Sequence, residues 1–147
     1  MRDCVFCRIV RREAPAEIVY EDEKAMAFMD INPVTPGHTL LIPKAHFRNI
    51  FDLDEEVASH LMKVAVKLAP ILREAMEADG LNILNANEPA AFQSVFHFHL
   101  HLVPRTFGDG IMPPWIQKPG NPAQIRAAAE RIRKVVEAKK VWSGKGD

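Results

Sequence analysis

The stretch HFHLHLV, residues 97–103, places three histidines at alternate positions with apolar residues between them. Residues two apart on a β-strand lie on the same face of a sheet, so His97, His99 and His101 are predicted to share one face. The intervening apolar side chains then point the other way, into a hydrophobic core. A plain solvent-facing surface is the alternative interpretation, but a random polar face would rarely consist of histidine alone. The pattern therefore indicates a functional strand whose histidines lie on the surface opposite the core.

Four further strands are predicted from short apolar runs bounded by turn residues. They cover residues 17–23, 25–30, 38–43 and 81–85, and the histidine strand itself covers 95–104. An amphipathic helix separates the third strand from the fourth, and a second helix, at about 121–140, follows a link rich in glycine and proline. Strands joined mainly by hairpins favour an α+β domain, with a mostly antiparallel five-stranded sheet, one long helix between strands and a C-terminal helix.

The long helix is predicted over residues 54–78, where apolar residues recur every three or four positions. Asp52 or Asp54 can cap its start, and Gly80 suits its end. Pro70 lies inside the pattern. Because proline removes a helical hydrogen bond and crowds the preceding turn, a kink or a break is expected there.

Composition narrows the class of protein. The 147 residues are expected to form a single domain over 1–147, and 48% hydrophobic with 26% charged residues is typical of a soluble globular protein. Basic and acidic residues number 19 each, so no overall charge attracts nucleic acid or anionic lipid. No apolar run approaches the length of a membrane span, and the charged start lacks the apolar region of a signal peptide. We therefore expect a cytoplasmic protein with reduced thiols and with neither a nucleic-acid nor a membrane partner.

The three histidines cannot bind one metal ion together. On an extended strand the outer two Cα atoms are about 13 Å apart, and a histidine reaches a zinc ion at most about 6.5 Å from its own Cα. All three would meet one ion only if the outer pair were nearly collinear with it, and tetrahedral zinc excludes that arrangement. The three side chains are therefore expected to have different roles.

A separate metal site is suggested by Cys4 and Cys7, which have the CxxC spacing of zinc ligands. Since no other cysteine exists, the remaining ligands would come mostly from histidine. The candidates are His38, His46 and one end of the histidine triplet, whereas His60 is interpreted as a solvated residue of the long helix. An unmetallated CxxC and a redox pair are the alternatives, but the strand–helix context typical of a redox motif is missing.

Three segments of the chain, in the same order, resemble the histidine triad nucleotide-binding proteins. HFHLHLV matches their His-φ-His-φ-His-φ-φ signature, in which φ is apolar, and the flanking QSVFHFHLHLVPR looks like the bacterial members. MDINPVTPGHTLLIPKAH is similar to their N-terminal half, and CVFCRIV to their zinc-binding start. The resemblance covers residues 4–105 and implies the fold of that family, a histidine triad (HIT)-like fold.

The resemblance also implies an activity. Proteins of this kind are nucleotidyl hydrolases or transferases that act at the α-phosphorus of purine nucleoside phosphoramidates or dinucleoside polyphosphates, through a covalent nucleotidyl-histidine. By analogy His99 is the nucleophile, and His101 lies by the phosphate and leaving group and assists proton transfer. His97 falls where zinc-containing relatives place a ligand, with Cys4, Cys7 and His46. The implied cofactor is one structural Zn²⁺, with no organic cofactor.

The chemistry of imidazole supports the role given to His99. A neutral imidazole nitrogen attacks phosphorus well near pH 7, because its ordinary pKa is about 6.5. The P–N bond that forms is reactive enough for water to cleave, so one difficult step becomes two easier ones. The other ring nitrogen must be held by an acceptor, and a backbone carbonyl is expected.

Further site residues follow from the resemblance. Asp30 corresponds to the carboxylate that accepts the ribose hydroxyls, with Phe28 and Ile31 near the base; read alone, Asp30 could equally be a turn residue before Asn-Pro. His38 corresponds to a position near the active site, where it is expected to support the catalytic residues. The implied partners are a purine nucleotide substrate and a second copy of the chain, contacted through the apolar helix that includes Val57.

The phosphate side of the site is expected in the loop before the histidines. Gln93 and Ser94 correspond to a phosphate-contacting pair, and a serine hydroxyl can stabilise charge that develops on a phosphate or leaving-group oxygen. Asn87 corresponds to a phosphate-side asparagine, for which Asn85 is the substitute if the loop is shorter. The family usually has glycine where this chain has Phe92. Because phenylalanine does not easily take a positive φ, the loop is expected to follow another path, with Phe92 as a wall of the pocket.

A zinc-stabilised protein that binds nucleotides or partners with little turnover is the alternative function. The intact pair of His99 and His101 favours catalysis, since binding alone does not need a nucleophile.

Overall fold

The computed structural model describes residues 4–111 and 117–140. Two compact units make up the chain, residues 1–111 and 112–147, and each is described by itself. A single domain over 1–147 stays a prediction.

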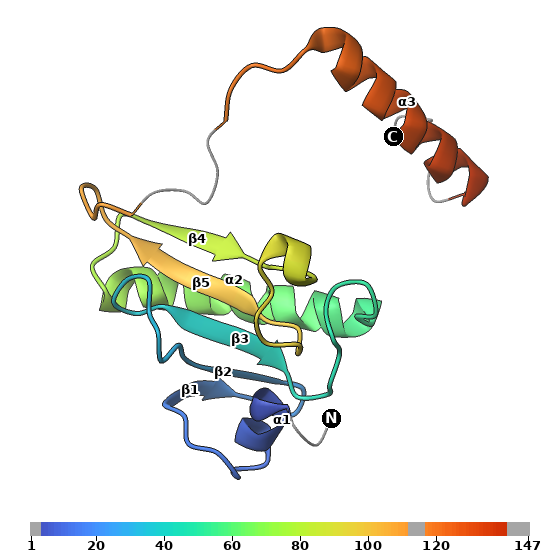
Figure 1. Ribbon diagram of the computed structural model, residues 1–147. Coiled ribbons are helices and arrows are strands. Elements are labelled where there is room, and N and C mark those ends of the chain that lie inside the picture. The colour runs from blue at the N-terminus through green and yellow to red at the C-terminus, as the bar shows by residue number, and fades with distance from the viewer. Residues whose placement is uncertain (1–3, 112–116, 141–147) are drawn as a thin grey trace. The chain divides into compact units, whose positions relative to one another are not determined.

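The first unit is built on one antiparallel sheet of five strands in the order β1-β2-β3-β5-β4 (Figure 1). The strands are β1 (Ile18–Glu21), β2 (Ala25–Met29), β3 (Thr39–Pro43), β4 (Gly80–Leu84) and β5 (Leu100–Arg105). Each neighbouring pair is antiparallel, and β5 lies between β3 and β4. The α+β class and the five-stranded antiparallel sheet are thus confirmed.

One face of the sheet is covered by α2 (Glu55–Ala75) (Figure 1). Its buried Leu61, Val64 and Leu68 form the main core with strand residues such as Leu41 and Leu102. This packing uses the side of β5 that the sequence assigned to the core.

The ends of α2 differ partly from expectation. The Asp54 carboxylate accepts a hydrogen bond of 3.0 Å from the Val57 N–H and caps the helix, as one of the two predicted candidates. The helix ends at Ala75 rather than near residue 78, and Gly80 begins β4. Of the kink or break expected at Pro70, the break is wrong, because α2 is one continuous element through it, while a kink stays a prediction. Leu68 and Leu72 are buried in the same core on either side of the proline, and this packing outweighs the loss of one hydrogen bond.

The regular part of β5 is shorter than predicted, since it begins at Leu100 rather than at residue 95. The N–H of Phe98 donates to the carbonyl of Phe47 at 2.7 Å. The alternation nevertheless continues through the irregular part, and Phe98, Leu100 and Leu102 all lie in the main core.

A short helix that the sequence did not predict, α1 (Val5–Val10), covers the other face of the sheet. Phe6 and Ile9 pack there on Met26, Phe28, Leu40 and Ile42 as a second hydrophobic core. His97 and His99 share this covered face, so the expectation that the histidines line an outer surface is wrong for these two, whereas His101 is half-buried. His97 is 0% exposed and His99 4%, because α1 closes over the side of the strand that alternation assigns to them.

The second unit contains α3 (Pro122–Ala138), which confirms the predicted C-terminal helix. Asn121 caps it by accepting from the N–H groups of Ala123 and Gln124. Among the described residues, no helix combines the length and the hydropathy needed to cross a bilayer.

Candidate active site and metal centre

Two cysteines and two histidines converge where α1 meets the sheet. Cys4 caps α1 and Cys7 lies in its first turn, so the CxxC spacing brings both sulfurs to the start of the helix. His46 follows β3, and His97 precedes β5. The four potential ligand atoms lie within 4.8 Å of one another. The structure therefore brings together all four residues that the resemblance implied as metal ligands.

The separations between these atoms fit tetrahedral zinc. With Zn–N near 2.0 Å and Zn–S near 2.3 Å, tetrahedral angles require N···N and N···S edges of about 3.3 to 3.6 Å. The Nδ1 atoms of His46 and His97 are 3.2 Å apart, and Cys4 Sγ lies 3.3 Å from the His97 Nδ1. Cys7 Sγ lies 3.3 Å from the His46 Nδ1 and 3.6 Å from that of His97. The residues present thus fit a zinc ion in both donor type and spacing.

His97 is oriented for metal binding by the backbone. Its Nε2 lies 2.8 Å from the carbonyl oxygen of Pro43, so Nε2 carries the proton and Nδ1 keeps its lone pair. Burial lowers the pKa of His97 to about 4 and lowers that of His46, which keeps both imidazoles neutral at pH 7. Burial and the hydrogen bond with Cys4 raise the pKa of the Cys7 thiol to about 11, so a bound cation would have to displace its proton.

The backbone also orients His99, but through the other ring nitrogen. Its Nδ1 lies 2.7 Å from the carbonyl oxygen of His97 and therefore donates to it, which leaves the lone pair on Nε2. The expectation that a backbone carbonyl fixes this ring is confirmed. Burial lowers the pKa of His99, so the imidazole is neutral at pH 7. The ring packs edge-on against Phe6 at 5.2 Å between centroids, and against His101 at 4.8 Å.

His101 ends a chain of hydrogen bonds that begins at a backbone amide. The N–H of Val34 donates to the Nδ1 of His38 at 3.0 Å, so the proton of that ring is on Nε2. The His38 Nε2 lies 2.9 Å from the His101 Nδ1 and 3.4 Å from an oxygen of Asp30. Donation to His101 leaves the proton of that ring on its own Nε2. Burial lowers the pKa of His101 to about 4 and lowers that of His38, so both rings are neutral at pH 7.

Asp30, His38 and His101 are also close enough to hold a cation. The protonation pattern opposes it, because the His38 Nδ1 accepts from Val34 and its Nε2 then carries a proton in place of a ligand lone pair. These three groups fit proton positioning better than metal binding.

The proposed base and ribose residues lie at the end of β2. The Asp30 side chain is 16% exposed, and one of its oxygens accepts from the N–H of Asn32 as in a turn, so the turn interpretation of this residue is also satisfied. Phe28 is buried edge-on against Phe6, with ring centroids 5.2 Å apart, whereas Ile31 is 87% exposed.

The proposed phosphate residues have different surroundings. Ser94 is exposed. Gln93 is 5% exposed, and its amide donates to the carbonyls of Arg48 at 2.7 Å and Val95 at 3.1 Å. A phosphate contact through this amide would require one of these bonds to break.

Two asparagines connect the same loop to its neighbours. The Asn87 side chain accepts from the N–H of Ile50 at 2.8 Å and donates to Asn85 at 2.6 Å. Asn85 in turn donates to the carbonyl of His99 at 2.9 Å, so it contacts the backbone of the proposed nucleophile.

Phe92 corrects the expectation for the loop. It has φ 69° and ψ 24°, the left-handed conformation that glycine takes easily, and its side chain is 86% exposed. The loop therefore contains the left-handed residue in spite of the phenylalanine, and Phe92 does not form a wall of a pocket. Glu88 also has a positive φ, of 74°. Such conformations cost roughly 1–3 kcal/mol each in residues other than glycine and persist only where the surroundings hold them.

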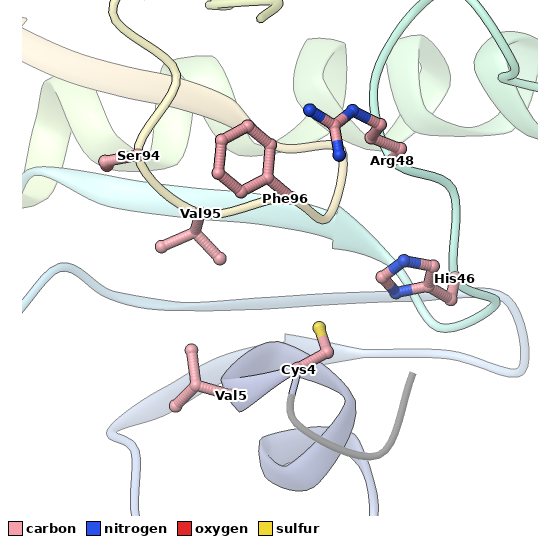
Figure 2. A pocket seen from close by; sticks show the side chains of 7 residues that line it. All are labelled: Cys4, Val5, His46, Arg48, Ser94, Val95 and Phe96. Carbon is pink, nitrogen blue, oxygen red and sulfur yellow. The ribbon is translucent and has the colours of Figure 1, made fainter. Parts of the chain in front are cut away.

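A cavity of about 450 Å³ opens beside the candidate metal ligands Cys4 and His46 (Figure 2). It is lined by Cys4, Val5, His46, Arg48, Ser94, Val95 and Phe96. Of the proposed nucleotide residues only Ser94 borders it, and neither His99 nor His101 does. The cavity therefore lies on the metal side of the proposed reaction centre.

Comparisons with known proteins show the family of the chain. The HIT domain model matches residues 11–108, and the chain belongs to the HIT family. The chain is 45% identical to Protein hit of Bacillus subtilis over 114 residues, which cover 77% of this chain and 79% of that protein. It is 36% identical over 103 residues to adenylylsulfatase HINT3 of Arabidopsis thaliana, covering 70% of this chain and 52% of that protein.

Solved structures show the same fold. SMU.412c from Streptococcus mutans matches with a TM-score of 0.87 at 44% identity, covering 92% of this chain and 87% of that chain. A Zn-bound histidine triad family protein from Mycobacterium smegmatis matches with a TM-score of 0.73 at 40% identity, covering 91% of this chain and 98% of that chain. The family includes nucleotide-binding proteins, and one relative carries zinc.

Proposed function

We propose that the protein is a nucleotidyl hydrolase or transferase that acts at the α-phosphorus of purine nucleoside phosphoramidates or dinucleoside polyphosphates. The observation that carries the proposal is the hydrogen bond of 2.7 Å between the His99 Nδ1 and the carbonyl of His97. It leaves an unprotonated Nε2 on a neutral, buried ring, which is the form of imidazole that attacks phosphorus. The relation to adenylylsulfatase HINT3 supports hydrolysis of a nucleotide in general.

In the proposed reaction, the His99 Nε2 forms a bond to phosphorus while the bond to the leaving group breaks. The Nε2–H of His101, whose ring centroid lies 4.8 Å from that of His99, donates to the leaving group or to a phosphate oxygen as negative charge develops. Water then cleaves the nucleotidyl-histidine, which releases the nucleoside monophosphate and restores His99. His38 holds the proton of His101 on Nε2 and is a positioning residue in this scheme.

The nucleotide would be held by the residues around this pair. Asp30 would accept the ribose hydroxyls, with Phe28 and Ile31 near the base. Ser94, Asn87 and Gln93 would face the phosphate, and Ser94 is the best placed of the three because its side chain is exposed. The side chains of the other two are occupied by internal hydrogen bonds, which favours an indirect role for them.

A Zn²⁺ held by Cys4, Cys7, His46 and His97 would link α1 to the segment after β3 and to the segment before β5. Its chemistry there would be structural, since four protein ligands complete a tetrahedral site. Elemental analysis of protein purified without chelators is expected to find about one zinc per chain. Metal-free but fully folded protein would contradict the site.

The remaining expectations are a purine nucleotide as the substrate, a homodimer and a cytoplasmic location. The exposed apolar side chains Met62, Val66 and Ile71 of α2 support a contact between two copies through this helix. Light scattering coupled to gel filtration tests the dimer, and a monomer at micromolar concentration would exclude it.

Trapping of the covalent intermediate tests the activity most simply. Protein mixed with adenosine phosphoramidate and quenched early should gain the mass of one nucleotidyl group. If no adduct and no turnover are found while the nucleotide still binds, the alternative holds, a zinc-stabilised protein that binds nucleotides or partners with little turnover.

A further inference from the structure

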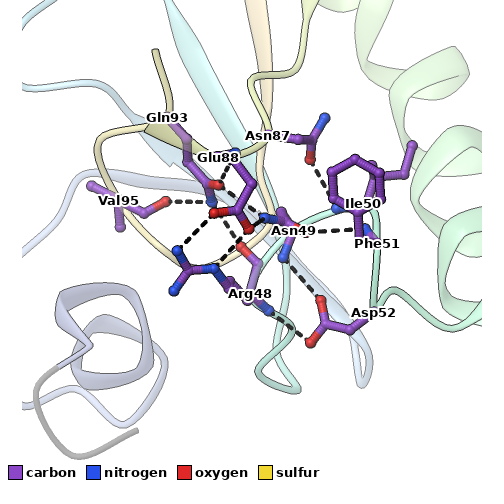
Figure 3. A network of polar contacts seen from close by, with 9 residues as sticks. All are labelled: Arg48, Asn49, Ile50, Phe51, Asp52, Asn87, Glu88, Gln93 and Val95. Atoms are coloured by element: carbon purple, nitrogen blue, oxygen red, sulfur yellow. Dashed lines mark hydrogen bonds and ion pairs between the residues drawn. The ribbon is translucent and has the colours of Figure 1, made fainter. Parts of the chain in front are cut away.

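A group of four side chains joins the proposed phosphate loop to the segment after β3, and we call it the clamp: Arg48, Asn49, Glu88 and Gln93 (Figure 3). Arg48 donates from Nε and Nη2 to the two carboxylate oxygens of Glu88, both at 2.9 Å. Asn49 donates to Glu88 at 2.6 Å and to the Gln93 oxygen at 3.2 Å. The arrangement is a bidentate ion pair supported by a buried amide.

The clamp holds the loop at several points. The Gln93 oxygen accepts from the N–H of Glu88 at 2.7 Å, while its amide donates to the backbone of Arg48 at 2.7 Å. The guanidinium carbon of Arg48 also lies 4.4 Å above the ring of Phe96, the residue before His97. One arginine therefore contacts the loop at Glu88 and again just before the histidines.

The segment that carries Arg48 is itself fixed. It follows His46, one of the proposed metal ligands, and the N–H groups of Arg48 and Asn49 donate to the carboxylate of Asp52 at 3.1 and 3.0 Å. The loop, in contrast, contains Glu88 and Phe92 with positive φ, so its conformation depends on external contacts. The clamp supplies those contacts from a segment that is itself hydrogen-bonded to Asp52.

We propose that Arg48 and Glu88 are positioning residues for the reaction, because they fix the loop that carries Ser94. The same loop starts at Asn85, which donates to the carbonyl of His99 at 2.9 Å. This inference rests on the proposed function. The side chains of Arg48 and Glu88 are 51% and 40% exposed, and exposed ion pairs contribute little to global stability. Loss of the pair should therefore reduce turnover much more than it reduces the melting temperature.

The test compares Arg48→Lys and Glu88→Gln with the wild type, using adenosine phosphoramidate as substrate. Because the loop would be misplaced rather than lost, each variant should lower kcat by about tenfold, with KM changed by less than about threefold. The double variant Arg48→Glu/Glu88→Arg restores the pair in reverse and should recover part of kcat. Asp109→Asn is the matched control, since Arg105, the last residue of β5, forms a similar bidentate pair with Asp109, at 2.7 and 3.0 Å. Its kcat should equal that of the wild type.

Two results would overturn the proposal. Turnover within twofold of the wild type in both single variants would show that the pair does not position the loop. A higher kcat/KM in Glu88→Gln, with a lower one in Arg48→Lys, would show that Arg48 acts on the substrate directly as a cation.

Hydrogen exchange of the loop amides separates this inference from the proposed function. If the wild type itself shows no turnover, the proposed function fails, and the exchange rates of residues 85–95 decide the clamp alone. Faster exchange there in both single variants, but not in Asp109→Asn, supports the clamp. Unchanged exchange contradicts it.

Discussion

His97 and His99 are two residues apart on the same face of the sheet, but backbone carbonyls place their ring protons on different nitrogens. His97 donates through Nε2 to the carbonyl of Pro43 and keeps the lone pair on Nδ1, toward the cysteines. His99 donates through Nδ1 to the carbonyl of His97 and keeps the lone pair on Nε2. The two lone pairs therefore lie where the proposed roles require them, on Nδ1 for a metal ligand and on Nε2 for a nucleophile, and the difference comes from which nitrogen meets a carbonyl.

Substitution of His99 is expected to have the largest effect on turnover. His99→Ala removes the proposed nucleophile and should lower kcat by roughly 10⁴-fold or more, with nucleotide affinity within roughly tenfold of the wild type. Steady-state turnover and equilibrium titration with a nucleoside monophosphate measure the two quantities. A parallel loss of binding and turnover would argue against His99 as the nucleophile.

Substitutions in the candidate metal site should lower the stability of the protein rather than act directly on the reaction. Cys4→Ser removes one sulfur ligand and should reduce the zinc content while lowering Tm by roughly 10 °C or more, because metal binding is coupled to folding. His60→Asn is the control, since His60 bonds Asp22 at 2.8 Å and lies outside the cluster. A variant with normal zinc content would show that Cys4 is not a ligand.

The pH dependence of stability should show that the rings are buried as neutral groups. Burial lowers the pKa of His101 from 6.5 to about 4, so between these values the unfolded chain binds more protons than the folded one. The contribution of His101 is fully present above pH 6.5 and is lost as the pH falls toward 4. Denaturation across this range should therefore show a smaller pH slope in His101→Asn than in the wild type. An identical slope would mean that His101 is not buried as a neutral ring.

The smallest effect is expected at Phe92, in the proposed phosphate loop. Phe92→Gly should raise the free energy of unfolding by roughly 0.5–1 kcal/mol, because glycine takes the left-handed conformation without strain. Phe92→Ala keeps the strain while removing the ring, so it should bring no such gain. Chemical denaturation measures both, and equal stability of the two variants would show that φ is not the cause.

The sequence was sufficient for the parts of the molecule that follow from periodicity and resemblance. The five strands, the long helix and the cluster of Cys4, Cys7, His46 and His97 were all predicted. Alternation assigned the histidines to the face opposite the main core, but it could not show that another element covers that face. The covering helix α1 has only six residues, too few for a helical period to be read.

The clamp and the loop were missed for a different reason. Arg48 and Glu88 are 40 residues apart, and neither belongs to a spaced motif, so only the fold brings them together. At Phe92, the preference of the residue for negative φ predicted another path, and the hydrogen bonds around Gln93 outweigh that preference. His60 was predicted to be solvated, and its bond to Asp22 depends on how α2 lies against the turn after β1.

Backbone carbonyls place the ring protons of His97 and His99 on different nitrogens. Two-bond ¹H–¹⁵N correlation spectra of the imidazole rings, in protein with zinc content measured, detect these tautomers. We expect His97 to be protonated at Nε2 and His99 at Nδ1, with the unprotonated Nε2 of His99 shifting when a nucleotide binds. A spectrum in which His99 carries its proton on Nε2 at pH 7 would refute this assignment.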